Sequence, residues 1–218
     1  MITPLLSLPN VVLFPKTPIP LHIFEECHQI MIRDVMAGDR KLTIALLRGE
    51  AAPEYAGVEN AHEIACLGRI ETCDELENGD YDIVVVGLRR VRIIRETQRF
   101  PYLAAEVEAA PGFDPGDCLD ELLGRHNRIS GLFARFMELA TDGNLDAEGI
   151  MPQMDFELLI NTVAMALNIS TDQKQDLLEM DNPFHRCDVL SAILQQHIET
   201  LGIISRFEHL KPDHPHFN

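Results

Sequence analysis

The apolar residues of this chain change their spacing at one short segment rich in proline and glycine. Residues 110–117 read APGFDPGD and hold two prolines and two glycines, a composition that interrupts regular secondary structure. Before this segment the apolar residues alternate as in strands, and after it they recur at the three- and four-residue spacing of helices. We therefore predict an α+β protein with a β-rich part at residues 1–110, a helical part at 117–210 and a flexible tail at 211–218.

The β-rich part contains several short apolar runs that turn signals separate. The runs that we interpret as strands are residues 11–14, 19–23, 42–46, 64–70, 81–86, 90–94 and 102–107. Asn78-Gly79 predicts a two-residue hairpin turn, and Gly87 predicts a bulge or bend in a long strand. Many short strands with such turns indicate a strongly bent sheet or a partly closed barrel.

One of these strands, residues 18–23, contains two prolines at alternate positions. Pro18, Pro20 and His22 alternate with apolar residues. Alternate residues of a strand point their N–H groups to the same side, and proline has no N–H group. One side of this strand therefore lacks donors, which predicts a strand at the edge of the sheet.

A helix follows this strand. Glu25 and Glu26 suit its first turn, because acidic side chains interact favourably with the helix dipole there. Its expected apolar stripe consists of Phe24, Cys27 or His28, Met31 and Val35. Gly38 is well placed to end it.

The helical part contains four predicted helices. The first covers residues 119–139 and the second 156–167. Ser170 and Gln173 have the form of a capping box for a third helix that extends to Met180. Pro183 suits the first turn of a fourth. We expect these helices to form a bundle.

The charge of the chain is strongly acidic. The formal net charge is -17, from 18 basic and 35 acidic residues. Such a field repels nucleic acid and anionic membranes, so we expect neither as a partner.

The five cysteines form no closely spaced pair, which is typical of reduced, mostly buried thiols. No apolar run approaches the length of a membrane span, and no signal peptide is recognised, so we predict a cytoplasmic protein.

Several segments, in the same order along the chain, resemble one known family. Residues 8–26 read LPNVVLFPKTPIPLHIFEE, residues 64–70 read IACLGRI, and residues 78–93 read NGDYDIVVVGLRRVRI. Residues 101–103 read PYL, residues 105–108 read AEVE, and residues 174–179 read KQDLLE. These motifs resemble the N-terminal substrate-binding (LON or La) domain of ATP-dependent Lon proteases, in the form of a free-standing bacterial protein. One departure is Cys27-His28, where the family commonly has Arg-Tyr.

The resemblance implies a bent, PUA-like β pseudo-barrel with one short helix, followed by a helical bundle. It also implies recognition of unfolded or tagged polypeptide. The catalytic parts of Lon are not expected here, because no Gly-Lys pair of a phosphate-binding loop occurs. None of the four lysines accompanies a serine segment like the Lon nucleophile. We predict no enzyme activity, no catalytic residues and no cofactor.

Two other patterns are open to a functional interpretation. The arginines between 89 and 99 would suit an anion or a small molecule, which gives an alternative function as a regulatory domain using the Arg89–Arg95 sheet face. Alternatively, they pair with the acidic strand Glu71, Asp74, Glu75 and Glu77 across the hairpin. His209, Asp213, His214 and His216 in the tail, and His62 with Cys66, hold metal-ligand types, but neither set predicts a metal site.

The candidate binding residues are His22, Phe24 and Tyr102. His22 and Phe24 share the face of their strand opposite Ile19, Leu21 and Ile23. They would line a peptide groove beside the unpaired edge, or else lie buried under the helical part. Tyr102 would line the groove with its amphipathic ring or pack at a domain junction. We predict a non-catalytic module that binds polypeptide clients or a protein partner.

Overall fold

The computed structural model describes residues 1–49, 57–98, 100–112, 118–141 and 153–207, with side chains described up to Ile203. The strands are β1 (Ile2–Leu8), β2 (Pro18–Ile23), β3 (Lys41–Leu46), β4 (Ile64–Glu75), β5 (Tyr81–Gln98) and β6 (Ala104–Ala109). The helices are α1 (Glu26–Ala37), α2 (Leu119–Ala140), α3 (Phe156–Ala166), α4 (Thr171–Glu179) and α5 (Pro183–Phe207), with the short 3-10 helix η2 (Val58–Asn60). The predicted α+β class is confirmed.

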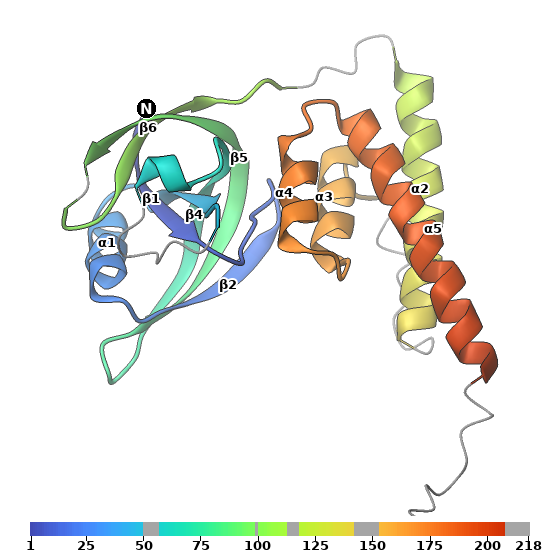
Figure 1. Cartoon of the computed structure of the whole chain (residues 1–218), viewed down its shortest axis with the longest axis horizontal. Helices are drawn as coiled ribbons and strands as arrows, with labels where there is room; N and C mark the ends of the chain where they lie inside the picture. Colours follow the sequence, from blue (N-terminus) through green and yellow to red (C-terminus); the bar gives the residue numbers. More distant parts are fainter. Residues whose placement is uncertain (50–56, 99, 113–117, 142–152, 208–218) are drawn as a thin grey trace, which may run out of the picture. The chain divides into compact units, whose positions relative to one another are not determined.

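The strands form a small barrel with one additional strand (Figure 1). The sheet order is β2-β5-β4-β3-β1-β6, and β5 also pairs with β6. That second pairing closes β5, β4, β3, β1 and β6 into a ring and leaves β2 outside it. The predicted edge strand at residues 18–23 is therefore confirmed. Among the described strands, β1 pairs with β3 in parallel, and the other pairs are antiparallel.

Strand β5 makes the closure possible because it is 18 residues long. Its first half pairs with β2 and with the second half of β4, whereas its second half pairs with the first half of β4 and with β6. The register with β4 shifts at Leu67/Gly68, opposite Gly87, so the predicted irregularity at Gly87 is present. Gly87 is needed because a Cβ atom there would lie 2.1 Å from the Phe14 carbonyl oxygen.

Two details of the barrel differ from the prediction. The hairpin between β4 and β5 has a three-residue loop, because Leu76 N–H donates to the Asp80 carbonyl and Gly79 N–H donates to the Leu76 carbonyl. Of its loop residues only Gly79 has a positive φ, of 88°, as in a three-residue loop with a glycine bulge. The buried run at residues 11–14 is not a strand, and the N-terminal strand is instead β1.

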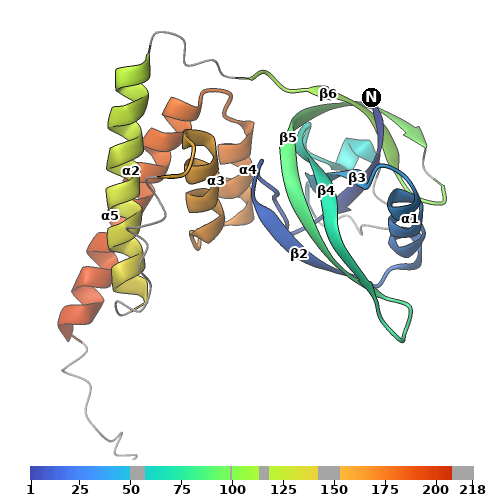
Figure 2. The same cartoon turned by 180° about the vertical axis from the view of Figure 1, so that it is seen from behind.

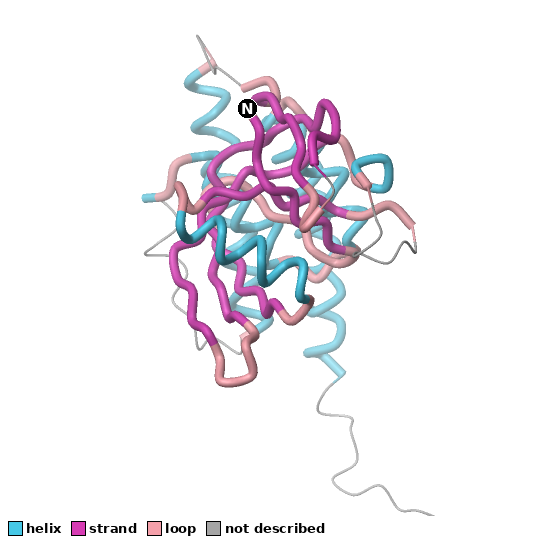
Figure 3. The backbone as a smooth tube through the Cα atoms, turned by 90° about the vertical axis from the view of Figure 1, so that its left-hand side faces the viewer, coloured by secondary structure: helices cyan, strands magenta, loops and turns pink. Residues whose placement is uncertain are grey.

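Helix α1 crosses one side of the barrel strands (Figure 3). It contributes Met31, Ile32 and Val35 to a buried cluster that also contains Ile44 and Val85. A second cluster fills another part of the barrel with Leu5, Ala65, Leu67, Val91, Ala105 and Val107 among its members. The predicted helical stripe is correct except for Phe24, which precedes the helix and is 64% exposed.

The chain forms two compact units, and each unit contains two segments that are separate in the sequence. One unit combines residues 1–114 with 164–182, and the other combines 115–163 with 183–218. Helix α4 belongs to the barrel unit, since Gln175 donates to the Ile64 carbonyl at 2.8 Å and Arg90 donates to the Met180 carbonyl at 2.6 Å. The predicted helical part at 117–210 is thus split. Residues 113–117, the centre of the predicted linker, lie outside the described residues.

The second unit contains α2, α5 and most of α3. Arg186 of α5 is buried and donates to the Asn161 side chain of α3 at 3.0 Å. The rings of Phe156 and Phe184 meet edge to face at 5.8 Å between centroids. The four predicted helices are all present, and the Ser170–Gln173 capping box of α4 is formed. Among the described residues, no helix is long and apolar enough to cross a membrane.

Candidate functional site

The free edge of β2 offers hydrogen-bond acceptors but few donors. The Thr17 carbonyl, just before β2, accepts from Gly87 N–H of β5 at 3.0 Å. Because alternate residues point the same way, the backbone groups of Ile19, Leu21 and Ile23 also face β5. Those of Pro18, Pro20 and His22 then face away from it, toward the side where no described strand pairs with β2. That side has three carbonyl groups and the single N–H group of His22.

The outward face of β2, β5 and β4 is hollowed into an open groove, which we call the β2 groove. Figure 2 shows these three strands running side by side toward the hairpin. The groove has a volume of about 460 Å³ and is lined by Pro20, Leu21, His22, Thr72, Asp74, Asp82, Ile83 and Val84.

Strand register explains how these residues meet. Pro20 lies opposite Val84, and Val84 lies opposite Thr72. Two residues along each strand, His22 lies opposite Asp82, and Asp82 lies opposite Asp74. The groove therefore has a mainly apolar row next to a charged row.

The charged row is organised around the His22 imidazole. Its Nδ1 atom lies 2.8 Å from Asp82 Oδ1, and its Nε2 atom lies 3.3 Å from Asp80 Oδ2. The hydrogen bond with Asp82, together with the charges of Asp82 and Asp80, raises the pKa of His22 above its usual 6.5. Asp80 is also held by Gln29 of α1, whose amide donates to it at 3.1 Å. This row stabilises a cationic side chain between carboxylates.

The structure brings together two of the three predicted binding residues. Phe24 stacks on His22 with ring centroids 6.2 Å apart and an interplanar angle of 26°. Both side chains are exposed, at 51% for His22 and 64% for Phe24. Tyr102 is half-buried, donates to Asp34 of α1 at 3.0 Å and contacts the barrel core. It does not line the β2 groove. Sequence alternation does not indicate Thr72, Asp74 or Val84 as lining residues, because their place depends on pairing across three strands.

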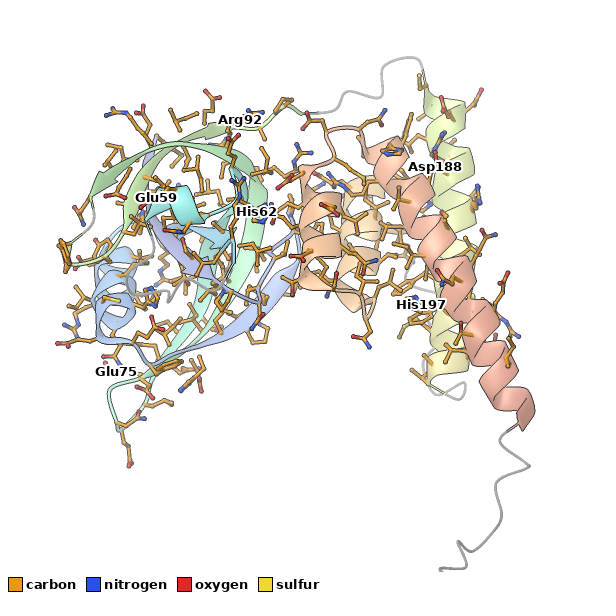
Figure 4. All side chains as sticks on the ribbon, in the orientation of Figure 1. Glu59, His62, Glu75, Arg92, Asp188 and His197 are labelled. Carbon is orange, nitrogen blue, oxygen red and sulfur yellow. The ribbon has the colours of Figure 1, made fainter. Side chains whose placement is uncertain are left out.

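The arginines after Gly87 have partners other than the predicted ones. Arg90 is buried and pairs with Asp181, Arg95 pairs with Glu106, and Arg92 lies 3.8 Å from Glu63. The predicted pairing with the strand at 71–77 is wrong, because that strand adjoins the first half of β5 and the arginines lie on the second. Figure 4 shows Glu75 of β4 near the hairpin and Arg92 of β5 far from it. Arg99 and the histidines of the tail lie outside the described residues.

One further group of polar residues was not predicted from the sequence. Glu25, Cys27 and His28, at the start of α1, have potential metal-ligand atoms that all lie within 4.8 Å of one another. His28 Nδ1 already contacts Glu25 Oε2 at 2.6 Å. A metal ion would have to replace this contact. His62 pairs instead with Glu179 of α4 at 2.9 Å, and Cys66 lies in the barrel core.

Curated relatives match the chain along nearly its whole length. A Lon protease of Solibacter usitatus is 24% identical over 203 residues, which is 92% of this chain and 25% of that protein. Lon protease 2 of Syntrophobacter fumaroxidans is 27% identical over 210 residues, which is 94% of this chain and 25% of that protein. The chain thus spans about a quarter of the length of these relatives.

Solved structures show the same fold. The N-terminal domain of a Mycobacterium avium complex Lon protease has a TM-score of 0.73 at 20% identity, with 90% of this chain and 100% of that chain covered. A Lon N-terminal domain protein from Xanthomonas campestris has a TM-score of 0.63 at 21% identity, with 88% and 98% covered. The sequence model of the ATP-dependent protease La (LON) substrate-binding domain matches residues 2–196. The chain therefore belongs to the LON substrate-binding domain family.

Proposed function

We propose that this chain is a non-catalytic recognition module that binds polypeptide in the β2 groove. The observation that carries the proposal is the open groove of about 460 Å³ on the outward face of β2, β5 and β4. The family of this chain is named for substrate binding, and the family model matches residues 2–196, which supports a recognition module. Protein segments are the ligands that such a surface suits best.

The open shape and the lining of the groove support a flexible polypeptide rather than a small metabolite. Small-molecule sites are mostly enclosed and bury most of their ligand, whereas this groove lies open on a sheet face. Its apolar row contains Pro20 and Val84, and the ring of Phe24, which is 64% exposed, stacks on His22 in the neighbouring row. An apolar side chain of a bound segment would bury area against these groups, at about 25 cal/mol per Å².

The edge prolines limit how the segment binds. An added strand needs alternating donors and acceptors from its neighbour, and the free side of β2 has only the His22 N–H as a donor. Prolines on an edge also protect natural sheets from unwanted pairing. We therefore infer that side-chain contacts in the β2 groove contribute most of the affinity, with isolated hydrogen bonds to the edge carbonyls.

The test is the binding of a fluorescently labelled unfolded protein, such as reduced casein, followed by anisotropy. The variant Phe24→Ser removes the exposed ring that stacks on His22, a lining residue of the groove. Phe100→Ser is the matched control, because Phe100 is 83% exposed on the same unit and does not line the groove. We expect Phe24→Ser to weaken binding by about tenfold, or about 1.4 kcal/mol, and Phe100→Ser to leave it within twofold of the starting value, or about 0.4 kcal/mol.

Two results would contradict the proposal. One is no binding by the unaltered chain at high micromolar concentrations. The other is an equal loss in both variants, which would indicate general adhesion to exposed aromatic rings. Unfolding curves of each variant must match those of the unaltered chain, so that a change in binding reports the groove alone.

A further inference from the structure

We propose that the β2 groove selects basic segments, in which a lysine or arginine adjoins an apolar residue. This inference rests on the proposed function and names the class of polypeptide that the groove prefers. The cation would enter the charged row at Asp74 and Asp82, and the apolar neighbour would cover Pro20 and Val84.

The charge of the groove supports a cationic ligand. The lining contains the carboxylates of Asp74 and Asp82 and, apart from His22, no basic side chain. These two carboxylates come from adjacent strands and lie opposite each other in the register. The Asp80 carboxylate reaches the same imidazole from the hairpin, at 3.3 Å. Carboxylates that lie close together repel each other, and a cation bound between them offsets this repulsion.

The contacts of the His22 imidazole mark where a cationic group would bind in this row. It contacts Asp82 on one ring nitrogen and Asp80 on the other. Its side chain is 51% exposed, so it has room to move aside for an incoming lysine or arginine. An incoming cation and a protonated His22 therefore compete for the same carboxylates.

The free edge of β2 also favours a basic ligand. The carbonyl groups of Pro18 and Pro20 face the free side and require donors. Lysine and arginine side chains supply several donors and no acceptors. The side chains of a basic segment can satisfy both the carboxylates and these carbonyls, whereas acidic side chains can satisfy neither.

The competition at His22 predicts a pH dependence. The charged groups that face His22 are Asp80 of the hairpin, Asp82 of β5 and, in the same row, Asp74 of β4. Above the raised pKa of His22 the imidazole is neutral and the carboxylates are available. Below it, the imidazolium pairs with Asp82 and Asp80 and offsets part of their charge. Binding of a basic segment should therefore weaken as the pH falls through this pKa.

The experiment compares three labelled peptides that share one apolar sequence and carry either two lysines, two glutamines or two glutamates. We expect the lysine peptide to bind about tenfold more tightly than the glutamine peptide. The variant Asp82→Asn should abolish this advantage. Glu108→Gln is the matched control, because it removes the same charge from an exposed position on β6, and should preserve the advantage.

The outcomes separate this inference from the proposed function. If all three peptides bind equally, the groove binds polypeptide without charge selection, and the inference is wrong while the proposed function stands. If no peptide binds, and unfolded casein does not bind either, the proposed function itself fails. The variant His22→Gln should flatten the pH dependence of lysine-peptide binding, and an unchanged pH profile would contradict the role of His22.

Discussion

Replacing Gly87 with alanine tests the contact that holds β2 on the barrel. The new Cβ atom would lie 2.1 Å from the carbonyl oxygen and 2.8 Å from the carbonyl carbon of Phe14, and 3.1 Å from Cys66 Sγ. The first two neighbours are backbone atoms, so no rotamer change relieves the overlap. The segment before β2 must move by about 1 Å to restore an ordinary contact.

That movement strains two backbone hydrogen bonds. Lys16 N–H donates to the Gly87 carbonyl at 2.7 Å, and Gly87 N–H donates to the Thr17 carbonyl at 3.0 Å. Their loss costs about 1 kcal/mol each. Phe14 is fully buried, and forcing an extra methyl group into such a site costs about 1–3 kcal/mol. The expected decrease in the free energy of unfolding is therefore about 3–5 kcal/mol.

Urea unfolding followed by tyrosine fluorescence measures this decrease. The three tyrosines, Tyr55, Tyr81 and Tyr102, all lie in the N-terminal half, so the signal reports the barrel unit. Gly112→Ala is the control, because a Cβ atom there meets nothing within 4 Å. A loss below about 1 kcal/mol for Gly87→Ala, which is an ordinary effect for a single substitution, would refute the steric reasoning.

Three further predictions concern a helix cap, a helix interior and the charged row. Ser170→Ala should lower the free energy of unfolding by about 1 kcal/mol, because the serine side chain accepts from the N–H of the N3 residue of α4 at 3.2 Å, and urea unfolding checks it. Gly131→Ala should raise it by roughly 1 kcal/mol, since the position lies inside α2 with nothing within 4 Å of a new Cβ atom; a lower stability would contradict this. NMR titration should give His22 a pKa above 6.5, and Asp82→Asn should lower that pKa, because the Asp82 hydrogen bond is its main cause. The pairing of His22 with Asp82 stabilises the folded chain fully at pH values below the pKa of histidine in the unfolded chain. This stabilisation is lost as the pH rises through the higher pKa of His22 in the folded chain.

Local signals predicted the helices well. The apolar spacing, the Ser170 capping box and Pro183 each act within a few residues, and α2, α4 and α5 begin within one residue of the predicted positions. The prolines of β2 likewise encode an edge, because a missing N–H group is a property of the residue itself. Strand β1 was missed, since its pairing with β3 and β6 depends on distant partners.

Non-local pairing explains what the sequence left open. The partner of Arg90 is Asp181, 91 residues away, and no spacing rule links them. The same contact places α4 with the barrel unit rather than with the other helices. In the candidate site, strand alternation correctly put His22 and Phe24 on one face. It does not find Asp74, because that residue joins the row only through the register of β4 with β5.

The two prolines also fix which residues face the groove. A one-residue slip of β2 along β5 would exchange its two faces. Pro18 and Pro20 would then point toward β5, where each lacks the N–H group that the ladder requires, and Ile19 and Leu21 would turn outward. The slip would lose two hydrogen bonds of about 1 kcal/mol each and expose two apolar side chains, so the observed register is strongly preferred. The prolines therefore keep His22 and Phe24 on the outward face, and they leave the free edge with acceptors that favour a donor-rich, basic ligand.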